Sequence, residues 1–209
     1  MPDTDTHIDT FLFDIGNVLV TFDFSKVVSF IEANSTADES TVQKEVEQRI
    51  VSLETGSIDG ATFLAQLADT LHFSGDLDQL HLVYQDIFEP NQPMHQLVDT
   101  LCKNYRLVLF SNTSDLHKDS LFERYPVFSQ FDGGVFSFIS GSMKPDDGMY
   151  RDAIINHRII PNRTLYLDDA PANIATGIRH GFHAIQYLPH QHERALAELA
   201  QLAPEIQSQ

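Results

Sequence analysis

The chain has 209 residues, with 13 Lys and Arg against 30 Asp and Glu, which gives a formal net charge of −17 at pH 7. This charge repels nucleic acids and anionic membrane surfaces and therefore disfavours both as partners. The single cysteine, Cys102, excludes an internal disulfide framework and a cysteine-rich zinc site. The polar start, residues 1–5, does not resemble a signal peptide, and no apolar run approaches the roughly 20 residues of a membrane span. We therefore expect a soluble, cytoplasmic protein.

Short apolar runs followed by polar residues alternate with amphipathic stretches along the chain. Most of these runs are four to five residues long, which is typical of strands buried on both faces of a parallel sheet. The predicted strands cover 10–13, 106–110, 135–139, 164–167 and 182–188. Helical periodicity is found over 146–157, and after Pro171, where Ile174 and Ile178 share a stripe. This alternation predicts an α/β fold with an open, parallel, Rossmann-like sheet flanked by helices.

The interval 24–90 interrupts this alternation with consecutive helical patterns. Gly56 and Ser57 mark a turn between two apolar stripes, which comprise Val42, Val46, Ile50 and Leu53, then Phe63, Leu64, Leu67 and Leu71. We predict an all-helical cap domain at 23–90, inserted into a core domain formed by 1–22 and 91–209. The alternative, in which these helices simply cover the sheet, stays open.

Polar side chains follow three of the predicted strands, and they would meet at the carboxyl edge of the sheet, where α/β proteins bind ligands. They are Asp14, then Ser111 and Asn112, then Asp168 and Asp169. Lys144, at the start of a predicted helix, can point to the same place. Crowded carboxylates must share a cation or a proton, and oxygen ligands without histidine or cysteine suit Mg²⁺. A metal, a lysine, a hydroxyl and an amide suit a phosphate group, and one carboxylate can attack phosphorus. The residues thus predict Mg²⁺-dependent phosphoryl transfer.

Four segments in this order resemble the four-motif signature of the haloacid dehalogenase-like (HAD) superfamily, and the match spans nearly the whole chain. They are 13–19 (FDIGNVL), 109–113 (LFSNT), 144–145 (KP) and 167–173 (LDDAPAN). Each motif is weak alone, but the ordered set is specific, and the helical insertion lies where this superfamily carries a small cap. Within the superfamily, the motifs are similar to those of the bacterial α-D-glucose-1-phosphate phosphatase group.

The resemblance implies a role for each matched residue. Asp14 would be the nucleophile and a Mg²⁺ ligand, and the carbonyl of Gly16 would be a second ligand. Asp169 would bind the metal, assisted directly or through water by Asp168. The remaining roles concern phosphate and the loop: Ser111 and the amide of Asn112 would hold the phosphoryl oxygens, Lys144 would neutralise charge, and Asn173 would orient the fourth-motif loop. The implied activity is hydrolysis of a small phosphate ester through an aspartyl-phosphate.

The chain departs from the superfamily at Gly16, where most of its phosphatases have a second aspartate that acts as general acid and base. Loss of such a group typically lowers the rate by ~10²–10⁴-fold. The loss matters less for an acidic leaving group such as the anomeric hydroxyl of a sugar 1-phosphate, so glucose 1-phosphate is the first candidate substrate. Asp23 is a possible replacement base, or else a solvated or helix-capping carboxylate.

Simpler roles remain open for several of these residues. Ser111 and Asn112 could cap the helix that begins near Asp115, and Lys144 could form a surface salt bridge. His190 and His192 have no third ligand at useful spacing, so we expect surface histidines. Cys102 and the phenylalanines of 128–138 are expected in the core.

Three other functions are weighed against the phosphatase. A phosphomutase needs an acid–base group that Gly16 does not supply. A 2-haloacid dehalogenase uses the same aspartate but needs neither magnesium nor the Asp168–Asp169 pair. A non-catalytic binding or regulatory protein would have little reason to keep Asp14, Lys144 and Asp169 together. The oligomeric state is not predicted.

Overall fold

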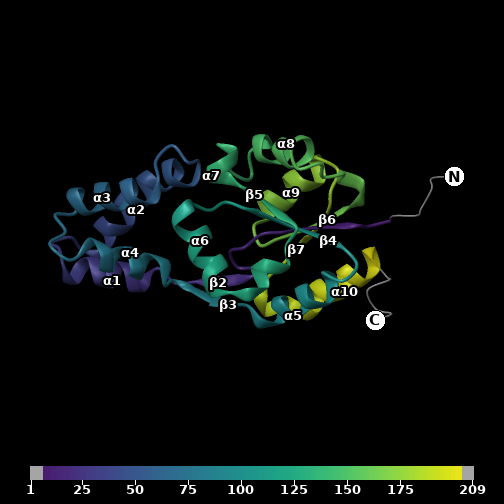
Figure 1. Cartoon of the computed structure of the whole chain (residues 1–209), viewed down its shortest axis with the longest axis horizontal. Coiled ribbons are helices and arrows are strands. Elements are labelled where there is room, and N and C mark those ends of the chain that lie inside the picture. Colours follow the sequence, from purple (N-terminus) through teal and green to yellow (C-terminus); the bar gives the residue numbers. More distant parts are fainter. Residues whose placement is uncertain (1–6, 204–209) are drawn as a thin grey trace.

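A computed structural model describes residues 7–203 of the chain, so the start on which the signal-peptide argument rests lies outside the described residues. Five parallel strands form the central sheet in the order β5-β4-β1-β6-β7 (Figure 1). Their bounds are β1 Thr10–Phe13, β4 Arg106–Ser111, β5 Gly133–Phe136, β6 Thr164–Asp168 and β7 His183–Gln186. The predicted open α/β fold is confirmed.

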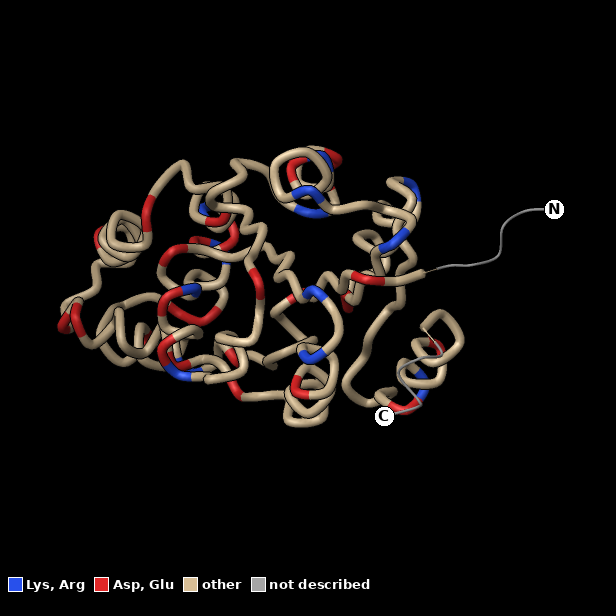
Figure 2. Tube along the Cα trace, turned by 45° about the vertical axis from the view of Figure 1, so that its right-hand side comes forward, with Lys and Arg blue, Asp and Glu red and all other residues tan. Residues whose placement is uncertain are grey.

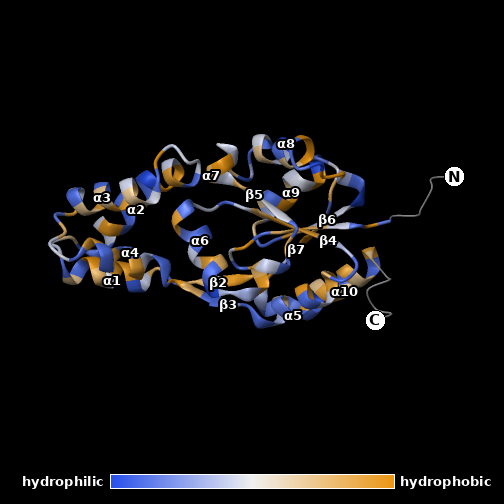
Figure 3. Cartoon of the chain, viewed as in Figure 1, coloured by the Kyte–Doolittle hydropathy of each residue, from blue (hydrophilic) through white to orange (hydrophobic). Residues whose placement is uncertain are grey.

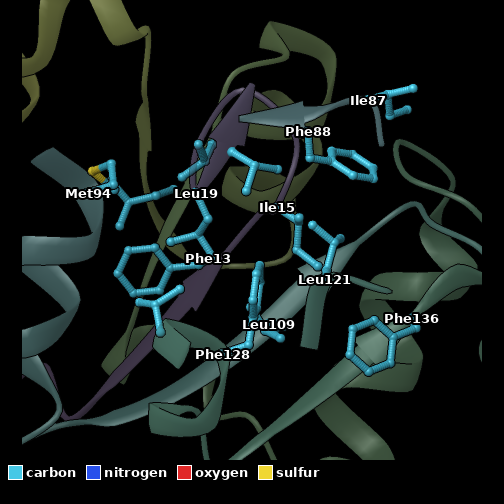
Figure 4. Packing of buried hydrophobic residues seen from close by; sticks show 14 of the residues in the cluster. Phe13, Ile15, Leu19, Ile87, Phe88, Met94, Leu109, Leu121, Phe128 and Phe136 are labelled. Carbon is cyan, nitrogen blue, oxygen red and sulfur yellow. The ribbon is translucent and has the colours of Figure 1, made fainter. Parts of the chain in front are cut away.

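Alternate residues of the strands pack against helices on opposite faces of the sheet, as expected when both faces are buried. On one face, Phe13 and Leu109 belong to a large apolar cluster that includes α5 (Gln92–Leu101) and α10 (His192–Leu202); Figure 4 shows part of it. On the other face, Leu12 and Phe110 pack with α8 (Asp147–Ile155) and α9 (Pro171–Arg179). Figure 3 shows hydrophobic colouring on the central strands and on parts of the helices around them.

Helices α1 (Ser25–Ala33), α2 (Glu39–Glu54), α3 (Gly60–Thr70) and α4 (Leu77–Gln85) follow one another and pack together at one end of the molecule (Figure 1). We call them the α1–α4 cluster. The short antiparallel strands β2 (Val20–Phe22) and β3 (Phe88–Pro90) enter and leave it side by side. Both predicted stripes lie in α2 and α3, with Gly56 in the turn between them. The division into cap and core domains stays a prediction.

The α1–α4 cluster contacts the core through α6 (Asp115–Arg124) and the short helix α7 (Ser137–Ser140). The backbone N–H of Gly60 donates to the Asp115 carboxylate, at 3.1 and 3.2 Å from its two oxygens. Gly56 has a φ of +69°, and a Cβ there would lie 2.1 Å from the Phe138 carbonyl oxygen. These contacts hold the turn after α2 directly against the core.

Two local expectations are wrong. The strand predicted over 135–139 ends at Phe136, and the chain turns into α7, which leaves Ile139 69% exposed. Ile178 on α9 is 58% exposed, because only one side of that helix meets the sheet. The remaining chain contains the 3-10 turns Pro126–Gln130, Pro161–Arg163 and Pro189–Gln191. Cys102 packs partly buried against the main cluster.

Acidic residues occur on nearly every part of the described trace, with basic residues spread singly or in small groups among them (Figure 2). The charge imbalance of the sequence is therefore distributed rather than confined to one segment. None of the described helices is long and apolar enough to cross a membrane.

Candidate functional site

The parallel register places the ends of three strands next to one another. Phe13, the last residue of β1, pairs with Leu109 of β4 and with Leu167 of β6. Asp14 directly follows Phe13, Asp168 directly follows Leu167, and Ser111 lies two residues after Leu109 at the end of β4, so the sheet brings all three to one edge. Asp14, Asp168 and Asp169 each offer a carboxylate oxygen, and these atoms lie within 4.8 Å of one another. The side chains that the sequence separates by about 150 residues therefore share one site.

Lys144 lies between two of these carboxylates and is buried with its side chain 1% exposed. Its Nζ is 3.0 Å from Asp14 Oδ1 and 2.6 Å from Asp168 Oδ2, and it donates to the Phe110 carbonyl oxygen at 2.6 Å. Burial opposes the charge of this lysine, but the two carboxylates outweigh it and raise the pKa of Lys144 above its ordinary value. The surface salt bridge considered for Lys144 is therefore wrong, since the ammonium is a buried cation of the site.

Asp168 is completely buried and its carboxylate accepts four hydrogen bonds. Oδ2 accepts from Lys144 Nζ and from the Tyr166 hydroxyl, and Oδ1 accepts from Ala170 N and Asn173 Nδ2, both at 2.9 Å. Four donors use the lone-pair sites of a carboxylate. Direct binding of a metal by Asp168 would therefore displace a partner, which favours assistance through water over direct contact, the two possibilities that the resemblance left open.

Asn173 holds the fourth-motif loop through this same carboxylate. It lies in the first turn of α9, directs Nδ2 to Asp168, and its carbonyl accepts the Tyr150 hydroxyl at 2.8 Å. The loop 168–173 is thus tied to both β6 and α8. This arrangement fits the orienting role expected for Asn173.

Asp14 and Asp169 have fewer partners than Asp168. The Asp14 carboxylate accepts from the backbone N–H of Ile15 at 2.8 Å, and burial raises its pKa to about 7 against the opposing effect of Lys144. Half-buried Asp169 accepts from Asn17 Nδ2 at 2.9 Å. Asn17 adopts a left-handed backbone with φ 53°, which asparagine tolerates better than most residues. Both carboxylates keep oxygen lone pairs for another ligand.

The composition of this cluster fits a magnesium ion. Three carboxylates face one ammonium, so the site carries excess negative charge that a divalent cation would offset. All candidate ligands are oxygen atoms, including the backbone carbonyl of Gly16 in the loop after Asp14, and hard oxygen ligands suit Mg²⁺. Asp14 and Asp169 are the carboxylates of this cluster that keep lone pairs for such an ion, and the Gly16 carbonyl stays a predicted ligand.

The second motif lies against Lys144. Asn112 clamps the Lys144 backbone, because its Nδ2 donates to the Lys144 carbonyl at 2.9 Å and its Oδ1 accepts from the Lys144 N–H at 2.8 Å. The side-chain amide is thereby occupied, which leaves the backbone N–H of Asn112 as the amide expected to hold phosphate. Ser111 is 2% exposed at the end of β4. Helix α6 is capped by Ser114, so the capping role considered for Ser111 and Asn112 is wrong.

Three residues discussed above lie elsewhere. Asp23 is exposed and accepts hydrogen bonds from the N–H and Oγ of Ser25 at 2.9 Å, just before α1, whose N-cap residue is Phe24. His190 is exposed, and His192 Nδ1 contacts the Tyr187 hydroxyl at 3.2 Å. Position 16 is covered by an aromatic ring, since a Cβ on Gly16 would lie 3.2 Å from the ring of Phe22.

Sequence reasoning did not find several side chains of the site. Asn17 and Tyr166 contact its carboxylates, and Glu54, Phe22 and His117 line a pocket that also reaches Gly16, Ser111 and Asn112. Asn17 lies inside one matched motif and Tyr166 directly precedes another, so their place in the sequence could have indicated that they belong to the site. Nothing in the helical periodicity distinguishes Glu54 from its neighbours on α2.

Known proteins resemble this chain over most of its length. Residues 8–181 match the haloacid dehalogenase-like hydrolase family. A D-ribitol-5-phosphate phosphatase of Bacteroides thetaiotaomicron is 26% identical over 188 residues, which cover 86% of this chain and 91% of that protein. A predicted HAD-like family hydrolase from Porphyromonas gingivalis superposes with a TM-score of 0.78 at 25% identity, over 93% and 98% of the two chains.

A further structure resembles the chain in fold. It is a HAD family enzyme of Bacteroides thetaiotaomicron, solved in complex with magnesium and inorganic phosphate. The TM-score is 0.75 at 19% identity, and the alignment covers 86% of this chain and 93% of that one.

Proposed function

Because the chain belongs to the haloacid dehalogenase-like hydrolase family, we propose that it is a Mg²⁺-dependent phosphomonoesterase acting on a small phosphorylated metabolite. The observation that carries this proposal is the buried cluster in which Lys144 lies between Asp14 and Asp168, with Asp169 alongside. One cation and three carboxylates are suited to bind a divalent metal and a phosphate dianion together. The 26%-identical sugar-alcohol phosphate phosphatase supports the same reaction class.

The protein's own groups divide the work as follows. Asp14 attacks phosphorus through a carboxylate oxygen, and an aspartyl-phosphate forms as the ester oxygen leaves. Lys144 neutralises charge between this carboxylate and the phosphoryl oxygens, and Asp168 holds Lys144 in place. Ser111 and the backbone N–H of Asn112 position the phosphoryl group. Asp14, Gly16 and Asp169 would hold the magnesium ion, which would offset the electrostatic repulsion between the negatively charged nucleophile and the phosphate.

The substrate is a small phosphate ester whose leaving group faces the α1–α4 cluster, which we take as the cap. Glucose 1-phosphate is the first candidate, because Gly16 removes the usual acid and an anomeric hydroxyl leaves readily. Ribitol 5-phosphate is the second candidate, because of the relative's activity. The two esters differ in how much they need a proton donor. The leaving group of ribitol 5-phosphate is a primary alcohol, which depends on a proton donor more than an anomeric hydroxyl does.

Phosphate release from a panel of sugar phosphates, polyol phosphates and nucleotides, with Mg²⁺ or with EDTA, tests the proposal. We expect release that EDTA abolishes and that Asp14→Asn removes, whereas Asp119→Asn, an exposed aspartate of α6, leaves it unchanged. Magnesium binding without turnover on any ester would instead indicate a binding protein. Chloride release from a 2-haloacid without magnesium would indicate a dehalogenase. Interconversion of glucose 1-phosphate and glucose 6-phosphate would indicate a mutase.

A further inference from the structure

The pocket next to Asp14 is lined both by residues of the core and by Glu54 of the α1–α4 cluster. Gly16, Ser111 and Asn112 line its core side, and Glu54 and Phe24 line the opposite side. A phosphate ester held by Ser111 and Asn112 would therefore lie in the same pocket that Glu54 lines. Glu54 and His117 are the titratable side chains among the residues lining this pocket.

Glu54 is the last residue of α2, and residues just before and just after it in the sequence pack closely and hold it toward the core. Leu53, just before it, is 1% exposed in the main apolar cluster. Gly56, two residues after it, lies directly against the Phe138 backbone of α7. The carboxyl is therefore placed by packing rather than by a polar anchor, and it forms no hydrogen bond or ion pair within 7–203, the part of the chain that the structure describes. A positioned carboxyl without a partner is free to act on a bound molecule.

The surroundings of Glu54 favour its protonated form. Burial raises its pKa to about 7, the negative Asp14 adds to this, and Lys144 opposes it. The C-terminal end of a helix also disfavours a negative charge. The other titratable groups facing it are Tyr84 of α4 and His117 of α6. The Tyr84 hydroxyl is buried and has no hydrogen-bond partner among the described residues. Tyr84 therefore donates no hydrogen bond to the Glu54 carboxyl.

The alternatives to Glu54 as proton donor are each engaged or absent. His117 stacks on the Tyr84 ring with centroids 5.0 Å apart, and its Nε2 lies 3.2 Å from the Tyr84 carbonyl oxygen, which accepts its single proton. Burial lowers the pKa of His117 to about 4, so the ring is neutral and has no second proton to give. The ring of Phe22 covers position 16, and Asp23 bonds to Ser25.

We propose that Glu54 is the general acid and base of this phosphatase, supplied by the α1–α4 cluster in place of the residue absent at position 16. The assignment rests on the proposed function. In the first step, the bond between phosphorus and the ester oxygen breaks while Asp14 bonds to phosphorus, and the Glu54 proton passes to that oxygen to give the free alcohol. In the second step, ionised Glu54 takes a proton from water as the water oxygen bonds to phosphorus. The Asp14–phosphorus bond then breaks, so phosphate and both starting carboxyl states are restored.

The leaving group makes this proposal testable. Nitrophenolate leaves without a proton, so the first step on p-nitrophenyl phosphate does not need Glu54, whereas an alkyl phosphate needs it in both steps. In Glu54→Gln we expect kcat on ribitol 5-phosphate to fall by about 10²–10⁴-fold. On p-nitrophenyl phosphate we expect a burst of one nitrophenolate per enzyme, then slow turnover, with phosphoenzyme trapped by acid quenching. Glu47→Gln, an exposed glutamate on the same helix, should behave as wild type.

Several outcomes separate this role from others. Equal losses on both esters without a burst would show that Glu54 only binds substrate or supports the fold, and would overturn the assignment. Unchanged turnover in Glu54→Gln would also overturn it. Added formate should restore part of the turnover of Glu54→Ala. If formate does not restore turnover and Glu54→Gln also shows no burst, the assignment of Glu54 is overturned. A wild-type protein inactive on every ester would instead overturn the proposed function, and this assignment with it.

Discussion

The ammonium of Lys144 lies 2.6 Å from Asp168 and 3.0 Å from Asp14, and all three side chains are buried. One positive charge thus forms ion pairs with two carboxylates in a buried position. Lys144 holds Asp14, the proposed nucleophile, and is itself held by Asp168. Buried ion pairs of this kind are costly to break, because removal of one partner leaves an uncompensated charge.

Replacement of Lys144 by methionine should affect both stability and activity. Two buried carboxylates would then face each other without a cation, and the free energy of unfolding should fall by about 3–5 kcal/mol. Loss of a charge that stabilises the phosphoryl group should lower kcat by about 10²-fold or more. Urea denaturation and phosphate release measure the two effects. Lys26→Met serves as the control, because its 3.5 Å ion pair with Asp86 is exposed and should contribute about 0–1 kcal/mol.

The two aspartates of the fourth motif should respond differently to replacement by asparagine. Asp168→Asn loses acceptor capacity for four buried donors and should lower the free energy of unfolding by about 3 kcal/mol. Asp169→Asn should abolish Mg²⁺ binding with a much smaller loss of stability, since this side chain is half-buried and bonds only to Asn17 among described residues. Calorimetric Mg²⁺ titration and urea denaturation test the pair. Wild-type stability in Asp168→Asn would contradict this division of roles.

Gly56 and Gly141 allow the contact between the α1–α4 cluster and the core to be tested with a matched control. Both have a left-handed backbone, with φ of +69° and +70°, so alanine at either position costs about 1 kcal/mol of strain. At Gly56 the added methyl would also meet the Phe138 carbonyl at 2.1 Å, whereas nothing lies within 4 Å at Gly141. We expect Gly56→Ala to lower Tm clearly more than Gly141→Ala. Equal shifts would mean that this contact adjusts without cost.

The buried histidine of α6 should make stability sensitive to acid. The pKa of His117 is about 4 in the folded protein against an ordinary value of 6.5, so the unfolded chain binds more protons between these values. The stability contributed by neutral His117 is full above pH 6.5 and is lost as pH falls toward 4, by about 3 kcal/mol. His117→Phe keeps an aromatic ring on Tyr84 and should lack this loss. Parallel curves of unfolding free energy against pH for both proteins would contradict the expectation.

The sequence alone predicted the parallel sheet and the residues at its carboxyl edge. Strands buried on both faces require continuous apolar runs. The change from an apolar to a charged residue, at Phe13 to Asp14 and at Leu167 to Asp168, can therefore be recognised in the sequence. Parallel strands also end at the same edge, so polar residues after each run had to meet. The apolar pattern gave a wrong prediction at two positions. At Ile139 the apolar run was too short to distinguish a strand from a helix. At Ile178 the apolar stripe extended beyond the side of α9 that contacts the sheet.

Only the tertiary structure assigned partners within the site. Asp168 and Asp169 are adjacent in sequence, yet one is enclosed by four donors and the other is half-buried, because successive side chains leave the strand end in different directions. Glu54 is one of several glutamates on α2, and its position beside the site depends on how Gly56 packs against Phe138. Charge, burial and hydrogen bonding at a site are properties of the assembled neighbours, so local sequence carries the residue types, and packing decides which of them act.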